Sequence, residues 1–383
     1  MVKLGDICTV VSGSTPSSSV AEYWNGNHIW ITPAELSDDS FIIYDSVRHI
    51  TDRAIQETSL KPFPEGTVIL SSRAPIGKTA IAGCKMYCNQ GFKNLICSDS
   101  IYNKYLYFFL STKTDYLNSL GRGATFKEIS KHIVENIKIY LPTIEEQKKR
   151  AGILERLMFL IQTRKQQLSK LDQLVKSRFI EMFGDPVKNP LGWDTRPFLS
   201  MGYCKNGMNF HTGDSGIKMH CLGVGDFKDY SIIDGTDHLP TISLKETPPE
   251  ESMLQDGDIL FVRSNGNKAL VGRSLIVYPR NTPTTYSGFC IRYRLTSFDV
   301  NIIYLLCVLK ADSMRKKMIG RGANIQNLNQ QILATLDIPI PSIYIQEQFA
   351  AFVQQIDKAK SSVKQSLEKL ETLKKSLMQE YFD

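Results

Sequence analysis

Basic and amide side chains gather in glycine- and serine-rich segments at two places in the 383-residue chain. Arginine can grip guanine O6 and N7, asparagine can grip adenine N6 and N7, and lysine mostly contacts phosphate. Repeated basic loops of this kind favour binding to a DNA duplex. The candidate DNA contacts are Ser72, Arg73, Lys78, Arg122 and Thr125 in the first half, and Arg263, Asn265, Lys268, Arg273, Arg321, Asn324 and Gln326 in the second. The alternative is a set of solvated turns, because Gly, Asn and Ser are ordinary turn formers.

Motifs for catalysis do not accompany these loops. An enzyme that methylates adenine in DNA would need a motif such as Asn-Pro-Pro-Tyr beside the flipped base, and the sequence contains no such motif. Gly77-Lys78-Thr79 suggests a phosphate-binding loop, but Ser72 stands where that loop requires its first glycine. Asp226-Phe227-Lys228 could belong to a metal-dependent nuclease, yet the matching segment of the first half lacks the lysine. We therefore expect no catalytic residue, no bound metal and no cofactor, and we expect that the chain is not an enzyme.

A long repeat organises the chain around these loops. The segment GRGATFKEISKHIVENIKIYLP from Gly121 recurs as GRGANIQNLNQQILATLDIPIP from Gly320, about two hundred residues later. Two further pairs of segments match in the same order: residues 65–70 with 256–261, and residues 77–81 with 272–276. The loops between these matching segments differ in length. This period is too long for a solenoid unit and suits a whole domain. Two similar domains with different recognition loops are therefore predicted.

Each domain is followed by a stretch with helical spacing of apolar residues, from Ile144 to Met182 and from Ile345 to Phe382. Each covers nearly forty residues, or roughly 60 Å at about 1.5 Å per residue. Such helices need a partner for their apolar stripes, and a twofold relation between the halves makes the pair antiparallel. The expected seam residues are Ile153, Leu157, Leu160, Leu168 and Leu171 in the first helix, and Ile356, Val363, Leu367, Leu370 and Leu377 in the second.

From Val2 to about Pro142, short runs rich in Val, Ile, Thr and Tyr are broken by Gly, Pro and Asn, which is typical of strands. Apolar helices are expected near residues 105–113 and 304–312. The predicted fold is α+β, with two similar mixed α/β domains joined and separated by two long antiparallel coiled-coil helices in a pseudo-twofold arrangement. The expected boundaries are residues 1–143 for the first domain, 144–185 for the first helix and connector, 186–343 for the second domain and 344–383 for the second helix.

Composition restricts the class of protein further. The net charge of +7 permits a polyanionic partner but does not by itself indicate one. No apolar run is long enough to cross a bilayer, and the first residues lack the pattern of a secretion signal. The eight cysteines are scattered and read as free thiols in a reducing compartment. We expect a cytoplasmic protein without a membrane partner.

Several motifs together resemble the specificity subunit of Type I restriction-modification systems. They are VILSSRAPIGKTAIAG from Val68, CNQGFKNL from Cys88, GRGATFKEIS from Gly121, LPTIEEQKKRAGIL from Leu141 and RFIEMFGDPVKNPLGW from Arg178. The resemblance covers essentially the whole chain, including the duplicated order of domain and helix.

The resemblance implies a function and a set of partners. Each globular domain would be a target recognition domain that reads one half of a bipartite sequence in double-stranded DNA. The helices would set the unread spacer and dock two methyltransferase (M) subunits, and restriction and translocation (R) subunits would join that core. S-adenosylmethionine and ATP with Mg²⁺ would belong to the partner subunits.

Two alternatives remain open on the sequence alone. The same scaffold could serve as the specificity subunit of another methyltransferase-nuclease system. A coiled-coil scaffold whose twin domains bind protein is the alternative outside DNA recognition. Binding through several DNA phosphates weakens steeply with ionic strength, whereas apolar protein docking does not, so the salt response separates DNA reading from protein scaffolding.

Overall fold

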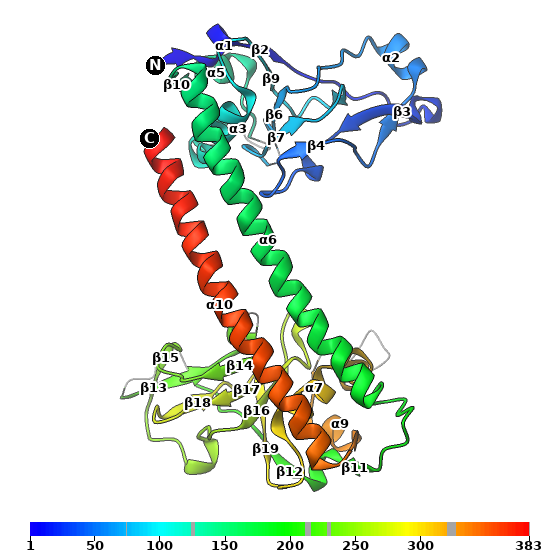
Figure 1. The fold of residues 1–383 in the computed structure, drawn as a ribbon, viewed down its shortest axis with the longest axis vertical. Coiled ribbons are helices and arrows are strands. Elements are labelled where there is room, and N and C mark those ends of the chain that lie inside the picture. The colour runs from blue at the N-terminus through cyan, green and yellow to red at the C-terminus, as the bar shows by residue number, and fades with distance from the viewer. Residues whose placement is uncertain (74, 124–126, 211–215, 228–230, 320–326, 383) are drawn as a thin grey trace. The chain divides into compact units, whose positions relative to one another are not determined.

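The computed structural model describes residues 1–383 except 74, 124–126, 211–215, 228–230, 320–326 and 383 (Figure 1). The chain divides into two compact units. Unit 1 comprises Met1–Gln166 and Lys364–Asp383, and unit 2 comprises Gln167–Val363. Each unit thus combines one globular body with a part of each long helix.

Unit 1 is built on a five-stranded sheet and a three-stranded sheet. The five strands, in spatial order, are β2 (Cys8–Val11), β9 (Asn94–Cys97), β6 (Val68–Leu70), β7 (Thr79–Ala82) and β4 (Ile42–Ile43). The three strands are β5 (His49–Ile50), β3 (Trp24–Ile31) and β8 (Tyr87–Cys88), and β1 (Val2–Lys3) pairs separately with β10 (Lys138–Ile139). Only the pairs β4–β7 and β3–β8 among these described strands are parallel.

The core of unit 1 lies between the larger sheet and the helix α3 (Asn103–Thr112). Six consecutive residues of α3, Tyr105 to Leu110, are buried, so this helix is covered on every side, as its continuous apolar run predicts. Strands β6 and β7 are fully buried as well. The shorter helices are α1 (Leu4–Ile7), α2 (Asp52–Thr58), α4 (Thr114–Leu120) and α5 (Lys131–Glu135).

Unit 2 repeats this topology strand for strand. Its five-stranded sheet has the order β12 (Gly202–Asn206), β19 (Cys290–Leu295), β16 (Asp258–Val262), β17 (Ser274–Tyr278) and β14 (Ile232–Asp234). Its three-stranded sheet has the order β15 (Thr241–Leu244), β13 (Ile217–Leu222) and β18 (Thr284–Tyr286), and β11 (Thr195–Pro197) pairs with β20 (Asp337–Pro339). The parallel pairs, β14–β17 and β13–β18, are also the equivalent ones.

The helices of unit 2 correspond in the same way. The apolar helix α7 (Ile302–Lys310) takes the place of α3, and α8 (Asp312–Ile319) and α9 (Gln330–Ala334) follow it. The predicted α+β fold with two similar domains is therefore confirmed. The relation between the two units, including the expected pseudo-twofold axis, stays a prediction.

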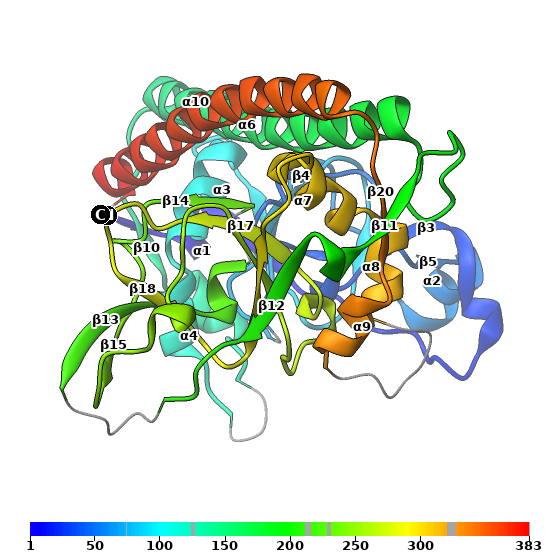
Figure 2. The same cartoon turned by 90° about the horizontal axis from the view of Figure 1, so that it is seen from below.

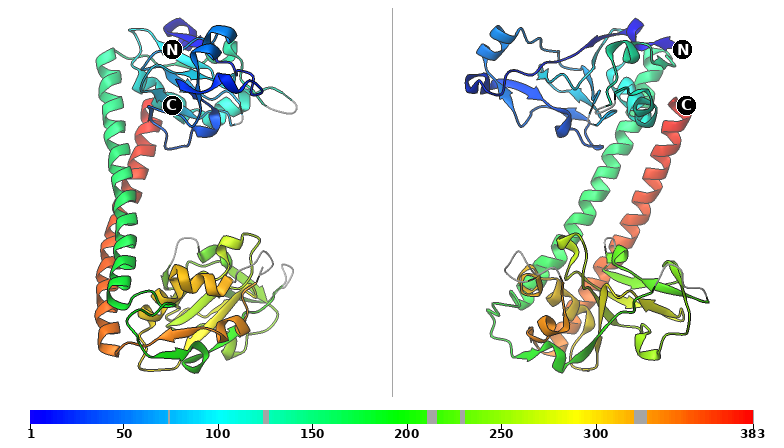
Figure 3. Two further views of the ribbon diagram at one scale, coloured as in Figure 1. Left: turned by 90° about the vertical axis from the view of Figure 1, so that its right-hand side faces the viewer. Right: turned by 180° about the vertical axis from the view of Figure 1, so that it is seen from behind.

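Two helices of 40 residues each follow the two bodies: α6 (Ile144–Phe183) and α10 (Ile343–Phe382). Within unit 1, the first part of α6 lies alongside the last part of α10 (Figure 3). The Arg150 guanidinium lies 5.0 Å from the ring centre of Tyr381, and Lys165 Nζ lies 3.4 Å from Glu371 Oε1. Numbers rise along one helix as they fall along the other, so the helices are antiparallel.

Within unit 2, the last part of α6 lies alongside the first part of α10 in the same sense (Figure 2). Lys360 Nζ contacts Asp172 Oδ1 at 2.6 Å, and the rings of Phe179 and Phe349 are 5.6 Å apart. Both pairings are antiparallel, as predicted. None of the helices that the structure describes has the length and apolarity needed to span a membrane.

The seam between the helices differs from its prediction at one leucine. Leu157 and Val363 are buried, and the other expected seam residues except Leu160 are half-buried. Leu160 is 41% exposed, and its assignment to the seam is wrong. Ile161 is 8% exposed and takes this place, because a step of four residues from Leu157 stays on the same helical face. Phe179 adds an aromatic contact with Phe349 to the seam, whereas Phe382 packs against Tyr105 and Phe109 of α3.

A buried glutamine fixes the start of α6 against unit 1. Gln147 is 0% exposed, and its Oε1 accepts a hydrogen bond from Tyr102 N at 2.8 Å. Its Nε2 donates to Ser100 O at 3.0 Å and to Pro142 O at 2.9 Å. The side chain thereby satisfies three backbone groups between the helix start and the loop before α3.

The start of α10 carries the same device in unit 2. Gln346, also 0% exposed, accepts from Asn301 N at 2.8 Å. Its Nε2 donates to Asp299 O at 3.3 Å and to Pro341 O at 2.8 Å. The two glutamines occupy equivalent positions of the repeat, so the way each long helix leaves its body is duplicated along with the body.

Candidate nucleic-acid interface

In unit 1, the loop after β6 and the segment before α5, which both carry predicted DNA contacts, lie next to each other. After β6, Ser72 N donates to Gly91 O at 2.8 Å, and Ile129 N donates to Ser72 O at 3.0 Å. One residue further, Arg73 lies opposite Glu128 in an antiparallel bridge. The end of β6, the start of β9 and the segment before α5 therefore form one junction.

Unit 2 forms the equivalent junction with the same backbone hydrogen bonds. Arg263 N donates to Phe289 O at 2.8 Å, and Leu328 N donates to Arg263 O at 2.8 Å. Ser264 then lies opposite Asn327 in an antiparallel bridge. These equivalent contacts align the two junctions residue by residue. Arg263 and Ser264 of unit 2 correspond to Ser72 and Arg73 of unit 1. Phe289 corresponds to Gly91, and Asn327 corresponds to Glu128.

The 3-10 turn that follows the central strand of each small sheet completes the junction. Asn89 N donates to Ile31 O at 3.2 Å in unit 1, and Ser287 N donates to Leu222 O at 2.9 Å in unit 2. The turns that follow are η2 (Pro33–Glu35) and η4 (Val224–Phe227). Pro33 and Val224 are therefore equivalent and lie beside Gly91 and Phe289, respectively.

The predicted contacts of unit 1 have different surroundings. Ser72 is 0% exposed and its hydroxyl accepts from Lys93 Nζ at 3.4 Å, so its prediction as a DNA contact is wrong. The Lys78 ammonium is ion-paired with Asp38 and its side chain is 22% exposed. Arg73 is half-buried and Arg122 is exposed. Thr125 lies outside the described residues.

The predicted contacts of unit 2 surround the end of β16. Asn265 is half-buried, and its Oδ1 accepts from Asn267 N at 2.8 Å. Lys268 is exposed on the turn η6 (Lys268–Leu270). Arg263 and Arg273 are half-buried and form long hydrogen bonds of 3.5 Å to Gly288 O and Phe227 O. Three further predictions, Arg321, Asn324 and Gln326, lie outside the described residues.

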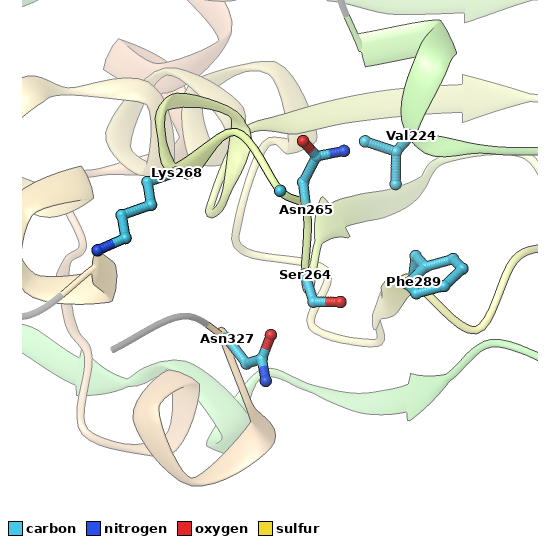
Figure 4. Close-up of a pocket in the computed structure, with 7 residues that line it drawn as sticks. Val224, Ser264, Asn265, Lys268, Phe289 and Asn327 are labelled. Atoms are coloured by element: carbon cyan, nitrogen blue, oxygen red, sulfur yellow. The ribbon is translucent and has the colours of Figure 1, made fainter. Parts of the chain in front are cut away.

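The junction of unit 2 opens into a hollow of about 550 Å³ (Figure 4). Its described lining consists of Val224, Ser264, Asn265, Gly266, Lys268, Phe289 and Asn327. Phe289 is 61% exposed, which is unusual for so large an apolar side chain. Amide, hydroxyl, ammonium and aromatic groups from three separate segments line the hollow, and Val224 adds an apolar side chain from a fourth.

Sequence reasoning missed part of this lining, namely Phe289, Asn327 and Val224. The available signal was the alignment of the repeat, which places Phe289 and Asn327 within one residue of recognisable anchors. It also missed Arg315 on α8, whose guanidinium donates to Ala269 O beside Lys268. Burial, together with the positive charge of Arg273, lowers the pKa of Arg315.

The acidic residues considered for a nuclease have a local structural role. Asp226 Oδ2 accepts from Gly223 N at 2.8 Å and closes the turn η4, while Lys228 lies outside the described residues. Among the residues that the structure describes, no cluster of three or more His, Cys, Asp or Glu side chains could hold a metal ion.

Comparison with known proteins identifies the architecture. The family model described as the Type I restriction modification DNA specificity domain matches residues 1–173 and 241–372. The MjaIX specificity subunit of a Type I restriction enzyme from Methanocaldococcus jannaschii is 37% identical over 225 residues, which are 54% of this chain and 52% of that protein. The StySPI specificity subunit from Salmonella potsdam is 26% identical over 411 residues, covering 98% of this chain and 86% of that protein. The chain thus spans about half the length of the first relative and most of the second.

Solved structures agree on the fold. A Type I restriction-modification S subunit from M. genitalium has a TM-score of 0.60 at 13% identity, with 100% of this chain and 95% of that chain covered. A chain from a study of assembly and conformational transition of the type I system has the same TM-score at 16% identity, with 100% and 96% covered. Because the family model matches most of the sequence, the chain belongs to the family of Type I restriction-modification DNA specificity domains, the family of the specificity subunits.

Proposed function

We propose that this chain is the DNA-reading subunit of a Type I restriction-modification complex and that it performs no chemistry itself. Unit 1 and unit 2 each read one half of a bipartite target in double-stranded DNA. The methyl donor, ATP and Mg²⁺ bind to partner subunits. The two units recognise different bases because their junctions carry different side chains.

One observation supports this proposal most directly. The same backbone hydrogen bonds hold Arg73, Gly91 and Glu128 in unit 1 and Ser264, Phe289 and Asn327 in unit 2. A repeated frame with exchanged polar groups at equivalent positions suits one scaffold that reads two sequences. If the repeat served only to build two similar folds, the side chains at these junction positions, which do not belong to the core, would not need to differ in charge and polarity.

The helices provide surfaces for two methyltransferase subunits, and restriction subunits join the resulting complex. Large apolar side chains on α6 and α10 are exposed in both units, which is typical of a binding surface when they are grouped. They include Phe159 (71%), Leu160 (41%) and Leu373 (47%) in unit 1, and Leu174 (46%), Ile180 (50%) and Tyr344 (66%) in unit 2. Phe159→Ala should weaken assembly with the methyltransferase, measured by co-purification, while the exposed Gln162→Ala should not.

Mapping of methylated adenines tests the proposed function. A host that expresses this chain with its methyltransferase subunit should methylate one bipartite sequence, and the same host without this chain should not. The purified chain alone should neither methylate nor cut DNA, and methyl transfer by the verified lone protein would contradict a purely recognising role. DNA binding should weaken steeply with salt, whereas a protein-interaction scaffold would show no such dependence.

A further inference from the structure

Resting on the proposed function, we infer that the junction itself is the base-reading element of each unit and selects one base pair in each half-site. In unit 2 the junction takes an A·T pair, read by Asn327 and Phe289. In unit 1 it takes a G·C pair, read by Arg73. The assignment follows from which side-chain groups each junction leaves available.

Asn327 has the groups needed to recognise adenine. Its side chain is exposed at the edge of the hollow, and it makes no side-chain hydrogen bond to any residue that the structure describes. An asparagine with both its amide NH₂ and carbonyl available can pair with N6 and N7 of adenine in the major groove. Asn265 differs, because its carbonyl oxygen already accepts from Asn267 N at 2.8 Å. Asn327 is therefore the stronger candidate for a bidentate contact.

Phe289 supplies the complementary apolar contact. Its ring is 61% exposed at the wall of the same hollow as Asn327 (Figure 4). Removing a large aromatic ring from water is favourable in free energy. The C5-methyl group of thymine is the apolar group that the major groove presents for such a contact. Adenine and thymine of one pair present N6 and N7 on one side and the methyl group on the other. The amide and the ring together therefore fit one A·T pair.

The junction of unit 1 leaves an arginine in the equivalent place. A Cβ atom built on Gly91 would lie 3.4 Å from Arg73 Cγ and 3.0 Å from Pro33 Cγ. The side chain of Arg73 therefore passes through space that a larger residue at position 91 would fill. No side-chain hydrogen bond or ion pair holds its guanidinium among the described residues. A guanidinium that is available in this way suits O6 and N7 of guanine.

The opposite acid does not neutralise this arginine. Glu128 lies across the bridge from Arg73, but its Oε1 accepts from Lys93 Nζ at 3.1 Å. The Lys93 side chain is only 9% exposed, and its ammonium also contacts Ser72 Oγ at 3.4 Å. In unit 2, Ile291 replaces this lysine by the strand register, and Asn327 replaces the acid. The Lys93–Glu128 ion pair of unit 1 therefore has no charged counterpart at the equivalent positions of unit 2, and it leaves the charge of Arg73 available.

Single substitutions in the full chain, expressed with its methyltransferase, test the inference by mapping of methylated adenines. Asn327→Ala and Phe289→Ala should each relax one A·T position in one half-site, with discrimination falling roughly 5- to 150-fold. Arg73→Ala should relax one G·C position in the other half-site. The control is Asn281→Ala, an exposed asparagine near the opposite end of β16, which should leave both half-sites unchanged.

A conversion variant tests the assignment directly. Ser264→Arg with Phe289→Gly and Asn327→Ala removes the two groups that read A·T and places the arginine of unit 1 in unit 2, so it should turn the affected A·T position into G·C, while the half-site of unit 1 stays unchanged. That unchanged half-site shows that the complex still assembles. Uniform weakening at every position, or no change at any position, would overturn the inference. A wild-type chain that directs no bipartite methylation would instead refute the proposed function.

Discussion

Buried charge distinguishes the sheet of unit 2 from that of unit 1. Asp258 on β16 is 1% exposed and accepts from both Arg294 Nε and Arg294 Nη2 at 2.8 Å. Arg292, which is 0% exposed, places Nη1 3.8 Å from the same carboxylate. The equivalent position in unit 1 is Thr67. One carboxylate therefore contacts two guanidinium groups in the interior of unit 2.

Asp258→Asn should strongly destabilise unit 2. The change leaves two largely buried cations without their counterion, which typically costs about 3–5 kcal/mol. The control is Asp256→Asn, because Asp256 is 45% exposed, pairs with Arg280 at 3.0 Å and should cost less than about 1 kcal/mol. Amide hydrogen exchange in β16 and β19 measures the effect, with unit 1 as the internal reference. Equal protection in both variants would show that the carboxylate does not support the sheet.

Buried thiols should make unit 2 sensitive to alkaline pH. Burial, with a smaller contribution from Asp226, raises the pKa of the Cys221 thiol to about 12. An unfolded cysteine has a pKa of about 8.5, so above roughly pH 9 the unfolded chain releases a proton that the folded chain keeps. The thiol's contribution to stability is therefore complete below about pH 8 and decreases as the pH rises toward 12.

Comparison of wild type with Cys221→Ala isolates this thiol, because all other groups titrate in both proteins. The variant should melt at a lower temperature at pH 7.5, since it loses buried volume. The difference between the melting temperatures should shrink from pH 8.5 to pH 10.5. A difference that stays constant over this interval would show that Cys221 is not buried as described.

Residue-level features could be predicted only where the chemistry is local. The sequence selects Arg73, Lys78 and Asn265 because basic and amide residues stand out within glycine-rich loops, and their contact with DNA stays a prediction. Ser72 is buried and its hydroxyl accepts from Lys93, which lies just before β9 and is distant in the sequence. Phe289 and Asn327 become neighbours of Ser264 only through strand register across distant segments. No local pattern reports such a register.

The long helices are tied to their bodies by the buried glutamines Gln147 and Gln346. Each side chain satisfies one backbone N–H and two backbone carbonyls. Gln147→Ala and Gln346→Ala should each destabilise the affected unit by roughly 2–4 kcal/mol, because each unsatisfied buried group costs about 1–3 kcal/mol and water can replace part of the loss. Thermal unfolding with the exposed Gln162→Ala and Gln348→Ala as controls tests this. Equal melting temperatures would show that water replaces the amides fully.

The sequence predicts where the long helices lie more accurately than it predicts which of their residues are buried. The absence of proline and the spacing of apolar residues predicted α6 and α10, since helix periodicity is a local property. Leu160 was assigned to the seam because it follows Leu157 by three residues, whereas the structure buries Ile161, which follows Leu157 by four. The small sheet of unit 1 was less predictable, because its strands β5 and β8 have only two residues each and leave no periodic signal.

The whole molecule repeats one plan, and the repeat was detectable because both copies keep the same anchors in the same order. The structure extends this correspondence to sheet order, to parallel pairs and to the glutamine at each helix start. Partners and target bases do not follow from the repeat itself. They depend on the side chains exchanged between equivalent positions, and these are the positions that the core does not restrain.

The proposed role of the helices as a spacer gives a prediction for the whole molecule. The boundary between the units falls after Gln166 in α6 and after Val363 in α10. One heptad inserted at both points keeps the apolar stripes in phase and lengthens each helix by about 10 Å. DNA advances about 3.4 Å per base pair, so the gap between the methylated half-sites should grow by about three base pairs while their bases stay the same.

Insertion of the heptad into α6 alone is the matched control for this experiment. It moves one half of α6 out of register with α10, so contacts such as that of Lys360 with Asp172 cannot form together with those of Lys165 and Glu371. The single insertion should therefore lower the melting temperature and reduce methylation, and the second insertion should restore both. A double variant that changed the bases of the half-sites at a constant gap would contradict the spacer model. Restored methylation at the original gap would also contradict it, because the helices would then not determine the distance between the two reading units.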